Sequence, residues 1–254
     1  TFTDSGPGFK KTLFDGTADH AINTATNYRS SDTQGTILAW VKLNNDAAGA
    51  DTIFGVGDNA AGVNYMQLRV DSATTWMMAM KDGTTSQTIR LGNTRTAGQW
   101  EMIVIQSTGS EYKMYINGAL DADAYMTQGS NNGKWFAGHT GTTSDNLTIG
   151  TLKRKNDADD FWRGQIAQVA IWGGSSGATG VLTAAQISAI HDLGPGADLT
   201  TSYGTGLVDY WTFGNKITEG TDTGSTIYSQ VSGGNDLTGV SLAAPYAGHT
   251  VTAV

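Results

Sequence analysis

The sequence predicts an all-β protein, an antiparallel sandwich of two sheets that carries one short helix. Short runs of apolar and β-branched residues recur about every ten positions, and Gly, Asn, Asp and Ser separate them. The chain has 34 glycines and abundant threonine, whereas charged residues make up only 15% of its 254 residues, a composition typical of strands and turns. Apolar residues make up 39%, which is enough for a sizeable core.

The apolar runs give the expected strands in chain order. They lie at residues 11–14, 36–43, 52–56, 65–70, 75–80, 88–91, 100–106, 112–116, 147–149, 165–172 and 207–213. Asn117-Gly118 follows the run at 112–116 and supplies the two positive-φ residues of a type I′ turn. We therefore expect a tight hairpin at that point.

Two of these runs are apolar on both faces. In residues 36–43, Ile37, Ala39, Val41 and Leu43 point to one side, and Leu38 and Trp40 point to the other. Residues 100–106 repeat the pattern, with Met102 and Val104 opposite Ile103 and Ile105. Strands of this kind lie centrally in a sheet, and we expect a further layer over their second face.

The short helix is predicted by its cap. Thr183 is the expected N-cap, and Gln186, three residues later, completes a capping box. Ile187 and Ile190 give the helix one apolar face that can dock on a sandwich, and Gly194-Pro195 ends it.

Charge and cysteine content exclude several classes of function. The net charge is −8 and the pI is near 4.8, and Lys/Arg residues cluster only at 153–155, so phosphate-driven binding of nucleic acid is disfavoured. The longest purely apolar run is about five residues, too short to cross a membrane. The absence of cysteine excludes disulfides, thiolate nucleophiles and cysteine-ligated zinc.

Six phrases follow one another along the chain: LFDGTADH at 13–20, TILAWVK at 36–42, GQWEMIVI at 98–105, KMYING at 113–118, FWRGQIAQVAIW at 161–172 and LTAAQI at 182–187. In this order they resemble the strands and the short helix of laminin G-like, concanavalin A-like jelly rolls. The resemblance covers residues 11 to 192 and implies a two-sheet antiparallel jelly-roll sandwich.

A second resemblance concerns the end of the chain. LVDYWTF at 207–213 and SGGNDLTG at 232–239 resemble a segment that usually precedes a jelly roll of this type, whereas here it follows one. That order is similar to laminin G-like proteins in the structural gene modules of marine tailed phages. We expect a jelly roll at residues 1–195 and a C-terminal segment at residues 196–254 that adds a strand to the same domain.

The resemblance implies a non-enzymatic structural or decoration protein on a virion surface, in the head or the tail. Its partners would be capsid or tail proteins of the same virion, with adhesion to host glycans as an added role. A protein that repeats on a lattice is expected to form a homo-oligomer. The alternative is an extracellular location, as the carbohydrate-binding module of a secreted or cell-surface protein.

Hydrolysis is not expected. Glycosidases place two carboxylates on either side of the scissile bond. The three glutamates, Glu101, Glu111 and Glu219, have no second carboxylate two to five residues away along a strand face. No cofactor is required by this interpretation.

Glycan binding would use aromatic faces. Trp135 and Phe136 follow the polar loop at 129–133, where an exposed aromatic residue would point to a binding role. Trp162, in the pair Phe161-Trp162, fits either a binding role or a core role.

Calcium is the candidate ion, because jelly rolls of the resembled family often hold Ca²⁺ at the rim. Asp15 and Asp19 are the first candidate ligands, although turn chemistry alone also favours Asp in an Asp-Gly turn. The closing strand reads Gly164-Gln165-Ile166-Ala167 and lacks an aspartate that the family often has there. Asp157, Asp159 and Asp160 form a second acidic loop, for which a solvated loop is the alternative.

Overall fold

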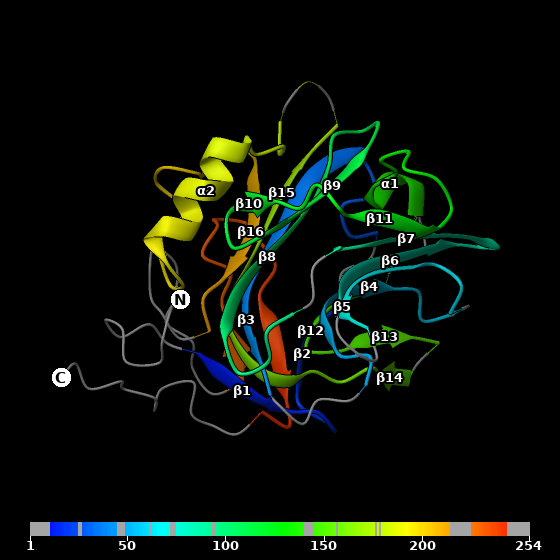
Figure 1. The fold of residues 1–254 in the computed structure, drawn as a ribbon. Helices are drawn as coiled ribbons and strands as arrows, with labels where there is room; N and C mark the ends of the chain where they lie inside the picture. Colours follow the sequence, from blue (N-terminus) through cyan, green and yellow to red (C-terminus); the bar gives the residue numbers. More distant parts are fainter. Residues whose placement is uncertain are drawn as a thin grey trace.

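The structure is a computed structural model that describes residues 11–24, 27–44, 49–60, 62–71, 75–92, 95–139, 145–155, 157–175, 177, 179–213 and 225–242. Two antiparallel sheets pack face to face, and a helix covers the far side of one of them (Figure 1). The expected all-β jelly-roll sandwich is confirmed. No helix among the described residues is long and apolar enough to cross a bilayer.

The seven-stranded sheet has the order β1-β15-β3-β8-β9-β10, and β16 also pairs with β15. Its strands are β1 (Thr12–Asp15), β3 (Gln34–Leu43), β8 (Trp100–Ser107), β9 (Tyr112–Ile116), β10 (Ala119–Leu120), β15 (Arg163–Gly174) and β16 (Leu207–Trp211).

The nine-stranded sheet has the order β11-β7-β6-β5-β4-β12-β2-β18-β17. Its strands are β2 (His20–Asn23), β4 (Thr52–Gly57), β5 (Tyr65–Val70), β6 (Trp76–Asp82), β7 (Thr85–Arg90), β11 (Tyr125–Gln128), β12 (Asn146–Ile149), β17 (Thr226–Ile227) and β18 (Leu237–Val240). A separate hairpin joins β13 (Leu152–Arg154) to β14 (Asp157–Asp159).

Two cores account for the strands that are apolar on both faces. Ile37, Ala39, Val41 and Leu43 of β3 lie in the core between the sheets. Leu38 and Trp40 lie in a second cluster on the outer side of the seven-stranded sheet, with Ile187 and Ile190 of α2 (Ala184–Leu193). The helix is therefore the further layer that the pattern of β3 and β8 requires.

The local predictions at the helix and the hairpin are confirmed. The Thr183 side chain accepts a hydrogen bond from the Gln186 backbone N–H, and the reciprocal contact completes the capping box. Gly194 ends the helix with φ 81°. Asn117 and Gly118 have φ 49° and 82°, as the predicted turn between β9 and β10 demands.

The C-terminal segment contributes strands to both sheets. In the seven-stranded sheet, β16 pairs with residues 169–172 of β15, and β1 pairs with residues 163–166 along the same edge of that strand. In the nine-stranded sheet, β18 pairs with β2. The buried Asp209 of β16 accepts hydrogen bonds from the hydroxyls of Tyr28 (2.9 Å) and Ser229 (3.1 Å) and from the side-chain amide of Asn235 (2.9 Å). This carboxylate joins three segments that are far apart in the sequence.

The sequence missed several short elements. These are β2, β11, β13, β14, β17, β18 and the one-turn helix α1 (Phe136–His139). Most are strands of four residues or fewer that lie at a sheet edge or in the hairpin, where too few residues are buried to produce an alternating pattern.

Candidate functional site

The hairpin β13–β14 lies on the outer face of the nine-stranded sheet, over β4. It can approach because Gly55 and Gly57 occupy alternate positions of β4 and present no side chain on that face. A Cβ on Gly55 would lie 2.9 Å from the Thr151 carbonyl oxygen, and one on Gly57 would overlap the Lys153 carbonyl oxygen. Real Cβ atoms do not make such contacts, so these glycines decide where the hairpin docks.

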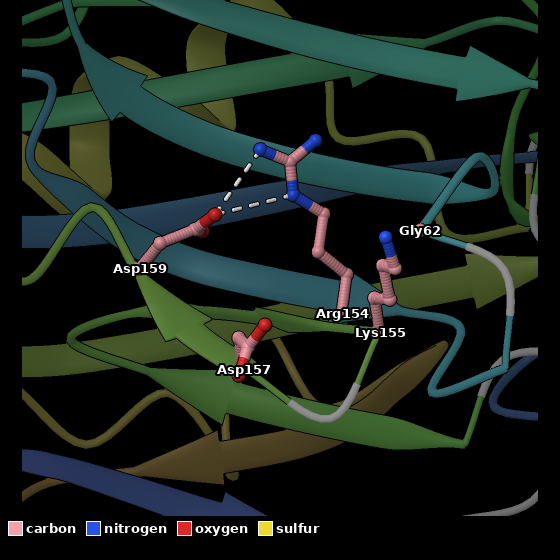
Figure 2. A pocket seen from close by; sticks show the side chains of 5 residues that line it. All are labelled: Gly62, Arg154, Lys155, Asp157 and Asp159. Carbon is pink, nitrogen blue, oxygen red and sulfur yellow. Dashed lines mark hydrogen bonds and ion pairs between the residues drawn. The ribbon is translucent and has the colours of Figure 1, made fainter.

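A polar pocket opens beside this hairpin. Its volume is about 340 Å³, and we call it the hairpin pocket; its lining residues are Gly62, Arg154, Lys155, Asp157 and Asp159 (Figure 2). The wall at Gly62 comes from the loop between β4 and β5, which carries a left-handed residue at φ 60°. The other four residues come from the hairpin.

Arg154 is held in place from two sides. Its Nη2 lies 3.1 Å from the Asp159 carboxylate, and its guanidinium lies 4.9 Å from the ring centroid of Tyr65 on β5. A guanidinium over an aromatic face is an attractive arrangement. The Arg154 side chain thus ties the hairpin to the sheet and forms one side of the pocket.

Two charged groups in the pocket have no partner among the described residues. The ammonium of Lys155 and the carboxylate of Asp157 form no hydrogen bond or ion pair there, and both residues are exposed. Figure 2 draws both side chains together with the Arg154–Asp159 pair. The lining of the pocket therefore includes a cation and a carboxylate that have no partner among the described residues.

The next acidic residue faces the sheet. Asp160 lies 3.1 Å from Nη1 of Arg69 on β5. Burial raises the pKa of Asp160, and the positive charge of Arg69 offsets part of that effect. Asp160 is therefore engaged with the sheet, whereas Asp157 faces solvent.

The predicted glycan-stacking aromatics are buried, which corrects that prediction. Trp135, Phe136 and Trp162 are exposed by 1%, 0% and 0%. Phe136 packs edge-on against Tyr28, with ring centroids 5.5 Å apart, and Trp162 stacks on Trp76 at 6.0 Å. The polar loop before Trp135 turns the chain inward, so Trp135 and Phe136, the first residue of α1, add their rings to the core.

The predicted calcium ligands Asp15 and Asp19 both accept hydrogen bonds within their own turn, and Asp19 accepts one from the Asp15 backbone N–H at 3.0 Å. The carboxylate of Asp15 accepts hydrogen bonds from the backbone N–H groups of Thr17, Ala18 and Asp19 and from the Thr17 hydroxyl. Burial raises the pKa of Asp15, but these hydrogen bonds to the charged carboxylate outweigh burial and hold that pKa well below its usual range. Its oxygen atoms already serve the turn, which is the structural role that Asp-Gly chemistry predicts.

In the second acidic loop, arginines pair with two of the three candidate calcium ligands. Asp159 and Asp160 each face an arginine, and Asp157 stands apart from them on the rim of the hairpin pocket. No group of three His, Cys, Asp or Glu side chains that could hold a metal occurs in the described part of the chain. Guanidinium groups are therefore the observed partners of Asp159 and Asp160.

The two glutamates in the described part of the chain lie in different settings and do not form a pair. Glu101 is buried and accepts hydrogen bonds from Trp76 Nε1 and the Thr96 backbone N–H, each at 3.1 Å. Burial raises the pKa of Glu101. Glu111 is an exposed partner of Lys113, and Glu219 lies outside the described residues.

The sequence contained two signals for this site that the strand pattern hides. The first is the alternation of Gly55 and Gly57 inside a buried strand, which marks a close backbone approach. The second is the short cationic cluster at 153–155 followed by acidic residues, which folds back as an ion-paired hairpin.

Comparison with known proteins agrees with this geometry. The family model described as the concanavalin A-like lectin/glucanases superfamily matches residues 15–188. No curated protein matches the chain significantly.

Solved structures share the fold at low identity. The CBM40 module of Ruminococcus gnavus IT-sialidase, bound to α2,3-sialyllactose, superposes with a TM-score of 0.55 and 18% identity over 71% of this chain and 94% of the module. A proposed carbohydrate binding protein from Bacteroides ovatus superposes with a TM-score of 0.60 and 16% identity, over 93% of this chain and 60% of that protein. A heptameric SAP-like pentraxin from Limulus polyphemus superposes with a TM-score of 0.51 and 18% identity, over 75% of this chain and 84% of the pentraxin.

Proposed function

The chain belongs to the concanavalin A-like lectin/glucanases superfamily, and from that premise we propose that it is a non-catalytic carbohydrate-binding module. The observation that carries the proposal is the hairpin pocket, where an unpartnered ammonium and an unpartnered carboxylate stand beside a guanidinium–carboxylate pair. The structural similarity to a CBM40 module and to a proposed carbohydrate binding protein supports the same function.

The chemistry of the pocket suits sugars. A sugar hydroxyl donates one hydrogen bond and accepts others, so a binding site needs donors and acceptors close together. Lys155 and Arg154 supply N–H donors, and Asp157 supplies acceptor oxygens. Their formal charges, with that of Asp159, sum to zero, so the pocket binds through hydrogen bonds rather than through net charge.

The proposal includes the absence of catalysis and of a required ion. The two described glutamates lie apart in different settings, one in the core and one in an exposed ion pair. Backbone N–H groups engage the candidate calcium ligands Asp15 and Asp19, and arginines engage Asp159 and Asp160. Of the candidate ligands, Asp157 alone has no partner among the described residues. Binding is therefore expected to be independent of calcium, and the glycan is expected to remain intact.

The test is a glycan array followed by titration calorimetry with the glycans that bind. Lys155→Ala and Asp157→Ala should each weaken binding by about tenfold or more, because each removes a charged hydrogen-bonding group. Leu193→Ala is the matched control, since Leu193 is 58% exposed on α2, the layer beyond the other sheet. Equal affinity of all four proteins, no bound glycan, or cleavage of the bound glycan would each contradict the proposal.

We also propose a virion-surface location, as a homo-oligomer in contact with capsid or tail proteins. Its support is the order of segments, in which the C-terminal segment follows the jelly roll and its strands β16 and β18 join both sheets. Mass spectrometry of the proteins that co-purify from the native source tests it. Constant stoichiometry with a capsid or tail protein supports this location, whereas isolation alone or joined to a glycan-active enzyme favours the extracellular alternative.

A further inference from the structure

Four residues form a row on the outer face of the nine-stranded sheet. The strand register pairs Arg69 with Met77, Met77 with Arg90, and Arg90 with Tyr125, across β5, β6, β7 and β11. Residues on either side of these, such as Leu68 and Ile89, point into the core. Because directly paired residues share a face, the row crosses the sheet over about 14 Å, three interstrand spacings. Met77 is itself buried, with 2% of its surface exposed, so the row reaches solvent through Arg69, Arg90 and Tyr125.

Ion pairs between arginine and aspartate lie along this face. Arg69 pairs with Asp160 at 3.1 Å, and Arg90 pairs with Asp71. With Arg154 and Asp159 at the hairpin pocket, three such pairs occur, and their side chains keep between 21% and 41% of their surface exposed. Each pair presents N–H donors and carboxylate acceptors to a ligand while carrying no net charge.

A tyrosine ring lies at each end of this arrangement. Tyr65 lies below Arg154 at the hairpin pocket. Tyr125 lies on the edge strand β11, where it is 50% exposed and continues the row after Arg90. An exposed tyrosine ring offers a flat, largely apolar surface with a polar tip, which the faces of a sugar can contact.

We propose that the glycan site extends from the hairpin pocket across the sheet to Tyr125 and that its ligand is an uncharged oligosaccharide rather than a single sugar. The inference rests on the proposed function and adds the ligand class. The length of the row calls for several linked sugars. All three arginines are ion-paired, and the charge of Lys155 is matched by that of Asp157, so the site carries no net positive charge for an acidic sugar. The net charge of −8 also repels anions at longer range.

The experiment is titration calorimetry with malto- and cello-oligosaccharides from disaccharide to hexasaccharide, together with lactose and 3′-sialyllactose as a pair that differs in charge. Affinity should rise with chain length and then level off. Tyr125→Ala should weaken binding of the longer chains by about three- to tenfold and leave disaccharide binding unchanged. Tyr125→Phe, which keeps the ring, should bind the longer chains as the unmodified protein does. Leu120→Ala is the matched control, because Leu120 is 51% exposed on a strand of the other sheet.

The outcomes separate this inference from the function on which it rests. Affinity that does not change with oligosaccharide length overturns the extended site and leaves glycan binding in place. The same conclusion follows if Tyr125→Ala weakens disaccharide binding as much as it weakens binding of the longer chains. Tighter binding of 3′-sialyllactose than of lactose overturns the uncharged ligand class. Absence of binding to every probe, while array glycans still bind at the hairpin pocket, also overturns the inference; absence of any glycan binding overturns both.

Discussion

Replacing Gly57 with alanine tests whether the hairpin β13–β14 must lie on β4 to form the site. A Cβ at this position would overlap the Lys153 carbonyl oxygen and lie 3.2 Å from its carbon and 3.4 Å from Arg154 Cβ. The backbone of Gly57 is not left-handed, so the effect of the substitution is steric. The hairpin must move outward, and Arg154 must then leave its position over Tyr65.

The magnitude follows from the contacts. Overpacking against a backbone that cannot yield costs about 1–3 kcal/mol of the free energy of unfolding. For a domain of this size that corresponds to a fall in Tm of about 2–12 °C. Displacement of Arg154, Lys155 and Asp157 should also weaken glycan binding by about tenfold, as loss of one charged hydrogen bond would.

Thermal unfolding and glycan titration of Gly57→Ala measure the two effects together. Gly49→Ala is the matched control, because a Cβ there meets only Asp51 Oδ1, at 3.7 Å. If Gly57→Ala kept both the Tm and the glycan affinity of the control, the hairpin would not need β4, and the account of the site would be wrong.

Three further predictions follow from burial and from the candidate ligands. Asp209→Ala should lower the free energy of unfolding by about 2–4 kcal/mol, measured by chemical denaturation, because the Tyr28 hydroxyl and the Asn235 amide lose a buried acceptor. Burial raises the pKa of Asp209, so the folded state holds its proton more tightly than the unfolded chain does. The stability that this proton adds is greatest below about pH 3.9 and is lost as pH rises through the folded pKa. Asp209→Asn should lack this dependence of unfolding free energy on pH, and a pH profile that is the same in Asp209→Asn and the unmodified protein would refute the prediction. Trp162→Ala should cost about 3–5 kcal/mol of stability, and Trp162→Phe should leave the glycan Kd unchanged, since the ring stacks on Trp76 in the core; a weaker Kd would restore a binding role. Addition of EDTA should change neither Tm nor glycan affinity, and a lower Tm that calcium restores would show that an ion site is present.

The fold was predictable because its main signals are local. The apolar run at residues 36–43 places Ile37 and Leu38 on opposite faces of a strand, and both faces are buried in the structure. Thr183 and Gln186 lie three residues apart and fix the start of α2 through contacts with each other. Alternation and capping depend only on neighbours in the sequence, so both could be recognised without the tertiary structure.

The site was not predictable in the same way. Trp135 and Trp162 are strong candidates for sugar stacking by residue type, but exposure depends on whether another layer covers the ring, and here the sandwich core does. The acidic residues after Arg154 have the density of a calcium loop, yet the register of the hairpin and its docking on β4, beside β5, place arginines against two of them. Aspartate chemistry alone does not distinguish a cation ligand from an ion-pair partner.

The sequence by itself determined the class of fold, the central strands, the capped helix and the absence of cysteine chemistry. The tertiary structure alone decided which aromatic residues are accessible and where charged side chains meet. Gly62 and Tyr65 lie about ninety positions before Arg154 and Asp157, and only the docking of the hairpin on Gly55 and Gly57 brings them together. Secondary structure arises from short-range periodicity, whereas a binding surface arises from contacts between segments whose proximity no local pattern encodes.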